Sequence, residues 1–290
     1  MKIGVIGGGA IGLLISSYLS KQHDVTVYVK RQSQFEDINN NGINLFGCNE
    51  LLLNANLNVA FLEKNVKQDL WFVSVKQHHL QDVIDDIPTQ VPVVFLQNGM
   101  SHLKLLQKRI HSYVGIVEHG AFKKYDNTVL HLGKGKITII SVTGSDQTVE
   151  NIVSQIHHVS FPFYKSENWE FLLKEKLIVN AVINPLTALF DVKNEEIVIN
   201  NYINIIAKQL HLEVAKTLKL DEKFYWDKVI EIAKNTGKNT SSMRQDIKYK
   251  RKTEIDAITG YIIEQSHHSL PYNQFVYDAI RAIEERNKNG

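Results

Sequence analysis

One lysine and two asparagines recur at intervals of four residues in an otherwise apolar stretch, KLIVNAVINPLTALF (176–190). Helix positions four apart are rotated by only about 40°, so Lys176, Asn180 and Asn184 form one polar stripe roughly 80° wide. An ammonium group and two amides suit a small ligand that carries a carboxylate, a carbonyl and a hydroxyl. The alternative is a solvated helix edge, although such an edge more often carries several charges. Pro185 removes one helical hydrogen bond and should bend the helix behind the stripe.

A glycine-rich loop, GGGAIG (7–12), directly follows the apolar strand KIGVI and opens a helix. It matches G-x-G-x-x-G inside a βαβ unit of about 30 residues, which is the context of a dinucleotide-binding loop. Gly7 permits the tight turn, Gly9 lets the backbone approach a pyrophosphate, and Gly12 lets the helix pack on the sheet. The helix N-terminus adds N–H groups for the anion. A turn without a ligand is the alternative; we predict cofactor contacts by Gly7, Gly8, Gly9, Ala10, Ile11 and Gly12.

The end of the second strand, DVTVYV (24–29), indicates which dinucleotide binds. Sites that prefer NAD usually place an acidic residue there, on the ribose 2′-hydroxyl. This strand is followed by Lys30 and Arg31 instead. The planar guanidinium suits a phosphate dianion, so we expect Arg31, helped by Lys30, to hold the 2′-phosphate of NADP. A solvated basic turn is the alternative.

Asn98 lies in QNGM (97–100), directly after a predicted strand of the first domain. The carboxyl ends of strands are where ligands bind in open α/β sheets, so Asn98 is a candidate ligand-binding residue. By itself, Asn-Gly is more typical of a plain turn.

The segment SSMRQDIKYKRKTEIDAITG (241–260) places Ser242 near a helix start and Glu254 two to three turns further on. Glu254 borders an apolar set made of Ile255, Ile258 and Ile262, and a carboxylate at such an edge could bind a substrate hydroxyl. The alternative is a simple ion pair with Arg251 or Lys250.

Two kinds of domain must position these residues. Strand candidates at 2–6, 24–29, 70–75, 92–96, 114–119, 129–132 and 136–140 alternate with helical stretches such as 78–87 and 101–110. This alternation predicts an α/β fold with a mainly parallel sheet. From about residue 167 the period is helical, with one polar break at GKNTSSM (237–243). We therefore predict a Rossmann-type dinucleotide-binding domain at 1–166, followed by an all-α substrate-binding and catalytic domain at 167–290.

The composition narrows the class of protein. The chain has 290 residues, of which 43% are hydrophobic and 22% charged, with a formal net charge of +2. This balance argues against a polyanionic partner such as nucleic acid. No apolar run approaches the roughly 18–20 residues that span a bilayer. The single cysteine, Cys48, cannot form an intrachain disulfide, so we expect a cytoplasmic protein.

With these residues in view, the whole chain resembles the ketopantoate reductases (2-dehydropantoate 2-reductases). The resemblance rests on the glycine loop with Arg31 and on five motifs. These are VSVK (73–76), QNGM (97–100), K-x-x-x-N-x-x-x-N-P (176–185), SSM-x-QDI (241–247) and R-x-TEID (251–256). The lysine–asparagine helix combined with SSM and TEID is highly specific, whereas the glycine loop alone is not.

This resemblance implies NADPH-dependent reduction of 2-dehydropantoate to (R)-pantoate, in pantothenate and coenzyme A biosynthesis. It implies that Lys176 is the general acid and that Glu254 lies near the substrate hydroxyl and the cofactor. The substrate-binding residues that it implies are Asn98, Lys176, Asn180, Asn184, Asn194 and Ser242, and the further cofactor contacts are Lys76, Asn98, Ala121 and Glu254. Family members often carry glutamine three residues after the Lys76 position; here it is His79, whose role stays open.

The chemistry agrees with the stripe. Hydride attack on a ketone builds negative charge on its oxygen, which the Lys176 ammonium can stabilise and then protonate. Two other classes of function stay open: an NADP-dependent reductase of another small 2-keto or 3-hydroxy acid, and a non-enzymatic NADPH-sensing protein. A metal site is disfavoured because the histidine pairs are sequence neighbours, which do not face the same way. A homodimer is possible through amphipathic faces such as 203–218.

Overall fold

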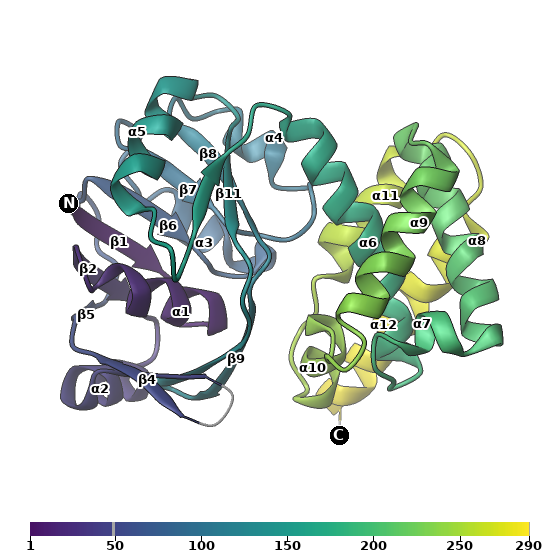
Figure 1. The fold of residues 1–290 in the computed structure, drawn as a ribbon, viewed down its shortest axis with the longest axis horizontal. Coiled ribbons are helices and arrows are strands. Elements are labelled where there is room, and N and C mark those ends of the chain that lie inside the picture. The colour runs from purple at the N-terminus through teal and green to yellow at the C-terminus, as the bar shows by residue number, and fades with distance from the viewer. Residues whose placement is uncertain (48–49, 290) are drawn as a thin grey trace. The chain divides into compact units, whose positions relative to one another are not determined.

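The computed structural model describes residues 1–47 and 50–289, so Cys48 lies outside the described residues. The chain divides into two compact units (Figure 1). Unit 1 comprises Met1–Gln97 and Leu103–Trp169, and unit 2 comprises Asn98–His102 and Glu170–Gly290. The segment Asn98–His102 thus joins the helical unit although sheet strands flank it in the sequence, a crossover that the predicted domains 1–166 and 167–290 did not include.

Unit 1 contains an eight-stranded sheet in the order β12-β11-β8-β7-β6-β1-β2-β5. All neighbouring strands are parallel except β8 and β11. Ile3 lies opposite Val25 on one side and Leu70 on the other, and all three are buried. This double burial explains why the strands read as continuous apolar runs. Their bounds are β1 (Lys2–Ile6), β2 (Asp24–Tyr28), β5 (Asn58–Ala60), β6 (Leu70–Val73), β7 (Val93–Phe95), β8 (Ser112–Val117), β11 (Ile137–Ser141) and β12 (Phe163–Lys165).

A second, four-stranded sheet in unit 1 has the order β4-β3-β10-β9. Its strands are β3 (Ile43–Phe46), β4 (Leu51–Ala55), β9 (Gly120–Tyr125) and β10 (Thr128–Gly133). Sequence analysis predicted only β10, because β4 and β9 bury few side chains and show no clear alternation. Helix α1 (Ala10–Leu19) contacts strands of both sheets, so it lies between them (Figure 1).

Two predicted helical stretches of unit 1 contain shorter helices than the sequence pattern indicated. The predicted helical stretch 78–87 contains only a 3₁₀ turn, η1 (Gln77–His79), and α3 (Gln81–Ile84), and the stretch 101–110 contains only α4 (Leu103–Leu106). The other two helices are α2 (Gln32–Asn41) and α5 (Asp146–Ile156). Helix α5 begins where the Ser145 hydroxyl accepts a bond from the Thr148 N–H, and it packs on β11 and β12.

Unit 2 is helical, as the period predicted. Its helices are α6 (Trp169–Leu189), α7 (Glu196–Ile199), α8 (Asn201–Leu218), α9 (Glu222–Asn235), α10 (Ser242–Lys248), a π-helical turn η2 (Asp256–Gly260), α11 (Tyr261–Gln265) and α12 (Pro271–Asn289). Side-chain caps set the starts of several helices: Asn200 caps α8 and Asp221 caps α9. The predicted polar break at 237–243 lies between α9 and α10.

Candidate active site

The glycine loop has the geometry that its spacing predicted. Gly7 has φ +109°, a conformation that disfavours a side chain, and its N–H donates to the Tyr28 carbonyl at 2.9 Å. A Cβ on Gly12 would meet the Gly7 carbonyl and would lie 2.5 Å from Ser74 Oγ, so only glycine lets α1 pack this closely. A Cβ on Gly9 would meet no other described atom within 4 Å. The loop is therefore open at the position where a pyrophosphate would approach.

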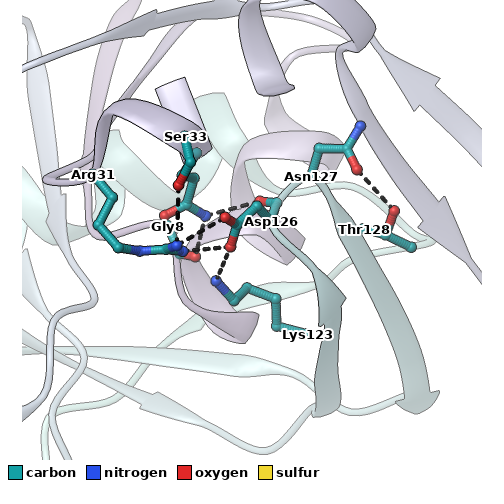
Figure 2. A network of polar contacts seen from close by, with 8 residues as sticks. Gly8, Arg31, Ser33, Lys123, Asp126, Asn127 and Thr128 are labelled. Carbon is teal, nitrogen blue, oxygen red and sulfur yellow. Dashed lines mark hydrogen bonds and ion pairs between the residues drawn. The ribbon is translucent and has the colours of Figure 1, made fainter. Parts of the chain in front are cut away.

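Arg31 lies just beyond β2 and immediately before α2, half-exposed. Its guanidinium forms a bidentate pair with the Asp126 carboxylate and donates to the Ser33 hydroxyl at 3.3 Å (Figure 2). Sequence analysis found no carboxylate at the end of β2 and missed Asp126, which lies 95 positions away in the turn between β9 and β10. No local pattern could have found it. The pair raises the pKa of Arg31, and Lys30 beside it is exposed.

The other predicted cofactor residues of unit 1 lie at the edges of elements. Lys76 is half-buried directly before η1. Ala121 lies in β9 and packs against the hydrophobic core of the unit. His79, the departure from the family pattern, is exposed and its Nδ1 lies 3.2 Å from the Asp82 carboxylate. The structure therefore gives His79 a local surface partner.

The lysine–asparagine stripe lies on α6, which continues through Pro185 to Leu189. Between Leu177 and Ala188, Asn180 is the single position that is not buried. Lys176 is also half-buried, whereas Asn184 is only 7% exposed. A solvated helix edge does not fit this burial. Lys176 and Asn180 instead lie where the neighbours of an apolar helix leave it partly uncovered, and Asn184 is buried.

Asn98 and Glu254 meet within unit 2. The Asn98 Nδ2 donates to Glu254 Oε2 at 2.9 Å, and both side chains are half-buried. Gly99 has φ +82°, and its Cα faces the Ala257 carbonyl so closely that a Cβ would clash. Asn-Gly is therefore more than a plain turn, because it fixes this loop against η2. Arg251, one of the two residues considered as an alternative ion-pair partner of Glu254, pairs with Asp246 at 3.1 Å.

The predicted helical spacing between Ser242 and Glu254 is wrong. Helix α10 ends at Lys248, and Lys250 adopts φ +52°, a left-handed conformation that interrupts the helical path. Glu254 lies two residues before the start of η2, with Ile255 between them. The apolar neighbours expected beside Glu254 are buried: Ile255, Ile258 and Ile262.

Ser242 and Asn194 occupy different environments. Ser242 is exposed at the first position of α10, whereas the neighbouring Ser241 is buried and caps the helix by accepting from the Arg244 N–H. Asn194 is 7% exposed, and its Nδ2 donates to Thr236 Oγ1 at 2.9 Å. The Nδ2 group of Asn194 thus links the segment before α7 to the end of α9 in unit 2.

His102 is a further polar residue that sequence analysis missed. It is 1% exposed, and neither ring nitrogen has a hydrogen-bond partner among the described residues. Burial, and then the nearby Lys176 ammonium, lower the pKa of His102 to about 4. Its position four residues after Asn98, in the segment that joins unit 2, is the only sequence clue.

Within residues 1–47 and 50–289, no group of three or more histidine, cysteine, aspartate or glutamate side chains could hold a metal ion. In the same part of the chain, no helix has both the length and the apolar character needed to cross a membrane.

Unit 1 is a Rossmann-type unit with an open glycine loop. The helical unit 2 carries the lysine–asparagine stripe and the Asn98–Glu254 hydrogen bond. Together these features define the class of two-domain dinucleotide-dependent reductases. Family models agree on both parts: residues 3–144 match "Ketopantoate reductase PanE/ApbA", and residues 168–284 match "Ketopantoate reductase PanE/ApbA C terminal". The chain belongs to the ketopantoate reductase family. The resemblance drawn from its motifs is confirmed.

Individual relatives support the same conclusion. The chain is 42% identical over 299 residues to the 2-dehydropantoate 2-reductase of Bacillus subtilis, covering 100% of this chain and 99% of the relative. It is 33% identical to the enzyme of that name from Listeria innocua, with 98% and 97% covered. The chain is thus an enzyme, an oxidoreductase that acts on a small molecule with a nicotinamide dinucleotide.

Solved structures confirm the predicted fold class. A probable 2-dehydropantoate 2-reductase from Bacillus subtilis superimposes with a TM-score of 0.86 at 38% identity, covering 98% of this chain and 100% of that one. A D-mandelate dehydrogenase solved with NADH and anilino(oxo)acetate has a TM-score of 0.91, with 99% of each chain covered. Its identity is 23%, so this likeness shows the fold alone.

Proposed function

We propose that this enzyme reduces 2-dehydropantoate to (R)-pantoate with NADPH, a step of pantothenate and coenzyme A biosynthesis. The observation that carries the proposal is the Asn98–Glu254 hydrogen bond, because it brings QNGM and TEID together in the unit that holds the lysine stripe. Relatives that match over nearly the full chain carry the name of this reaction.

Lys176 is the proposed proton donor. As the ketone becomes an alkoxide, the ammonium stabilises the developing charge and transfers a proton to that oxygen. The amides of Asn180 and Asn184 hydrogen-bond the substrate without neutralising its carboxylate. Asn98, Asn194 and Ser242 complete the proposed substrate contacts. Glu254 accepts a hydrogen bond from the substrate hydroxyl, as it accepts one from the Asn98 amide in the structure.

The proposed cofactor site is the loop Gly7–Gly12 with Arg31 and Lys30. Open space beside Gly9 and the guanidinium at the end of β2 fit a pyrophosphate and a 2′-phosphate. Lys76, Ala121, Asn98 and Glu254 are the proposed further contacts. When bound, the nicotinamide supplies the hydride; the residues of this chain hold the substrate, supply the proton and favour NADPH over NADH through Arg31.

Oxidation of NADPH at 340 nm in the presence of 2-dehydropantoate tests the proposal. We expect turnover in the wild type and a loss of at least about 1,000-fold in kcat for Lys176→Ala, with NADPH binding retained. Lys174→Ala is the matched control, because Lys174 lies on the same helix and pairs with Glu170 at 2.6 Å. NADPH binding without turnover of any keto acid would contradict an enzymatic role and favour the NADPH-sensing alternative.

A second candidate is the reduction of another small 2-keto acid. The D-mandelate dehydrogenase shares this fold at a TM-score of 0.91, so the same architecture serves a protein named for a different hydroxy acid. Comparing kcat/KM across a panel of 2-keto acids distinguishes the two. A higher value for an aromatic keto acid than for 2-dehydropantoate would replace the proposed substrate.

We also propose a cytoplasmic homodimer. A single cysteine suits a reducing compartment. Unit 2 exposes large apolar side chains on α8, Tyr202 at 80% and Ile205 at 59%, which a second copy could cover. A ketopantoate reductase from Staphylococcus aureus is dimeric. Light scattering that gives the mass of one chain at micromolar concentration would overturn the dimer.

A further inference from the structure

Asp126 brings a carboxylate to the residue that is proposed to bind the cofactor's 2′-phosphate. It lies in the two-residue turn between β9, which ends at Tyr125, and β10, which begins at Thr128. One carboxylate oxygen lies 2.9 Å from Arg31 Nη1, and the other lies 3.0 Å from Lys123 Nζ and also contacts Arg31 Nη2. Figure 2 shows both cations converging on this one side chain.

Buried contacts hold Asp126 in this position. Gln34 is 5% exposed, and its Nε2 donates to the Gly8 carbonyl and to the Asp126 carbonyl, both at 2.8 Å. The next residue in the turn, Asn127, is 7% exposed and donates to the Gly42 carbonyl at 3.1 Å. The turn is therefore tied to the glycine loop through Gln34, and the carboxylate meets Arg31 through the fold of unit 1 rather than through chance contact of two surface side chains.

The Asp126 carboxylate carries a negative charge that Arg31 and Lys123 stabilise. Hydrogen bonding to Arg31, and then Lys123, lower the pKa of Asp126 to about 2, so the carboxylate is ionised at every working pH. A guanidinium presents one planar fork to a bidentate anion. In this structure both Nη1 and Nη2 of Arg31 donate to the Asp126 carboxylate. A phosphate dianion that approaches Arg31 must displace the carboxylate or share the cation with it.

We propose that Asp126 is a specificity-determining residue that competes with the 2′-phosphate of NADPH for Arg31. This inference rests on the proposed role of Arg31. Binding of the NADPH 2′-phosphate breaks or weakens the Arg31–Asp126 pair, whereas the uncharged 2′-hydroxyl of NADH leaves the pair intact. Asp126 therefore lowers the affinity for NADPH and reduces the preference for NADPH over NADH.

Asp126→Asn tests the competition, because the amide keeps the shape of the side chain and the backbone bond to Gln34 remains. We expect the Kd for NADPH, measured by nucleotide fluorescence, to fall about three- to tenfold, and the Kd for NADH to change less than twofold. Adenosine 2′-monophosphate should gain affinity like NADPH, whereas adenosine 5′-monophosphate should not. Asp227→Asn is the matched control, since it removes the same charge from an exposed pair with Lys223 on α9.

An unchanged or weakened NADPH affinity in Asp126→Asn would overturn the inference, because Asp126 would then merely hold Arg31 in place. Arg31→Ala separates this failure from failure of the proposed function. If Arg31→Ala loses NADPH affinity while Asp126→Asn gains none, only the competition is wrong. If Arg31→Ala binds NADPH as the wild type does, the assignment of Arg31 to the 2′-phosphate is wrong. The proposed competition between Asp126 and the 2′-phosphate is then wrong as well.

Discussion

The side chain of Asn98 donates a hydrogen bond to Glu254 across 156 positions of sequence, with 2.9 Å between Asn98 Nδ2 and Glu254 Oε2. The contact depends on Gly99, whose positive φ and missing side chain let the loop lie against the Ala257 carbonyl. Two residues that were predicted separately to bind the substrate or cofactor are therefore parts of one polar group. Each holds the orientation of the other.

Asn98→Ala and Glu254→Gln test this mutual dependence. We expect each to lower kcat/KM for 2-dehydropantoate about 10- to 100-fold, because each removes a half-buried polar partner worth about 1–3 kcal/mol. The double variant should lose less than the product of the two factors. Strictly multiplicative losses in steady-state kinetics would mean that the two side chains act independently.

Two glycines of the loop should differ in role, Gly12 affecting stability and Gly9 affecting cofactor binding. Gly12→Ala places a methyl group against the Gly7 carbonyl and Ser74 Oγ, so we expect it to cost about 1–3 kcal/mol of unfolding free energy. Gly9→Ala meets open space, so its stability should stay within about 1 kcal/mol of the wild type while its affinity for NADPH falls. Urea unfolding and NADPH titration of both variants provide the check. Equal loss of stability in the two would contradict this division.

Buried histidines should make the protein sensitive to acid. Burial lowers the pKa of His102 and of His119 to about 4, against 6.5 for an ordinary histidine. The unfolded chain takes up these protons as the pH falls through about 6.5, whereas the folded chain does so only near 4, so stability is full above pH 6.5 and declines between these values. The difference amounts to roughly 3 kcal/mol at most for His102.

The pH dependence can be assigned with a variant that does not titrate. In His102→Gln, urea unfolding measured from pH 7 to pH 4.5 should show a shallower decline than in the wild type. His267→Gln removes an exposed histidine and serves as the control. Identical slopes in wild type and His102→Gln would show that His102 does not contribute.

Two adjacent serines should divide between stability and substrate binding. Ser241 is buried, caps α10 and accepts a hydrogen bond from Thr187 Oγ1 at 2.7 Å, so Ser241→Ala should cost about 1–2 kcal/mol of unfolding free energy. Ser242 is exposed, so Ser242→Ala should leave the melting temperature within about 1 °C and raise KM for 2-dehydropantoate. Calorimetry measures the stability of each variant, and initial rates measure its KM. A loss of stability in Ser242→Ala with a raised KM in Ser241→Ala would contradict this assignment.

Local patterns predicted the large sheet well and the irregular segments poorly. The strand at 2–6 and the helix after the glycine loop were found because apolar periodicity and glycine spacing are local properties. The small sheet was mostly missed because its strands are short and half-exposed. The helix expected through Ser242 and Glu254 ends at Lys248, because a left-handed residue at 250 redirects the chain without any glycine or proline to mark it.

The amino-acid sequence by itself determined the glycine loop, the polar stripe of α6 and the change from an α/β to a helical pattern, because each depends on local residue types and spacing. Only the tertiary structure decided that Asn98 lies with Glu254 in unit 2 and that Asp126 meets Arg31. Contacts between residues 156 and 95 positions apart arise from sheet order and loop packing, which no short stretch of sequence specifies.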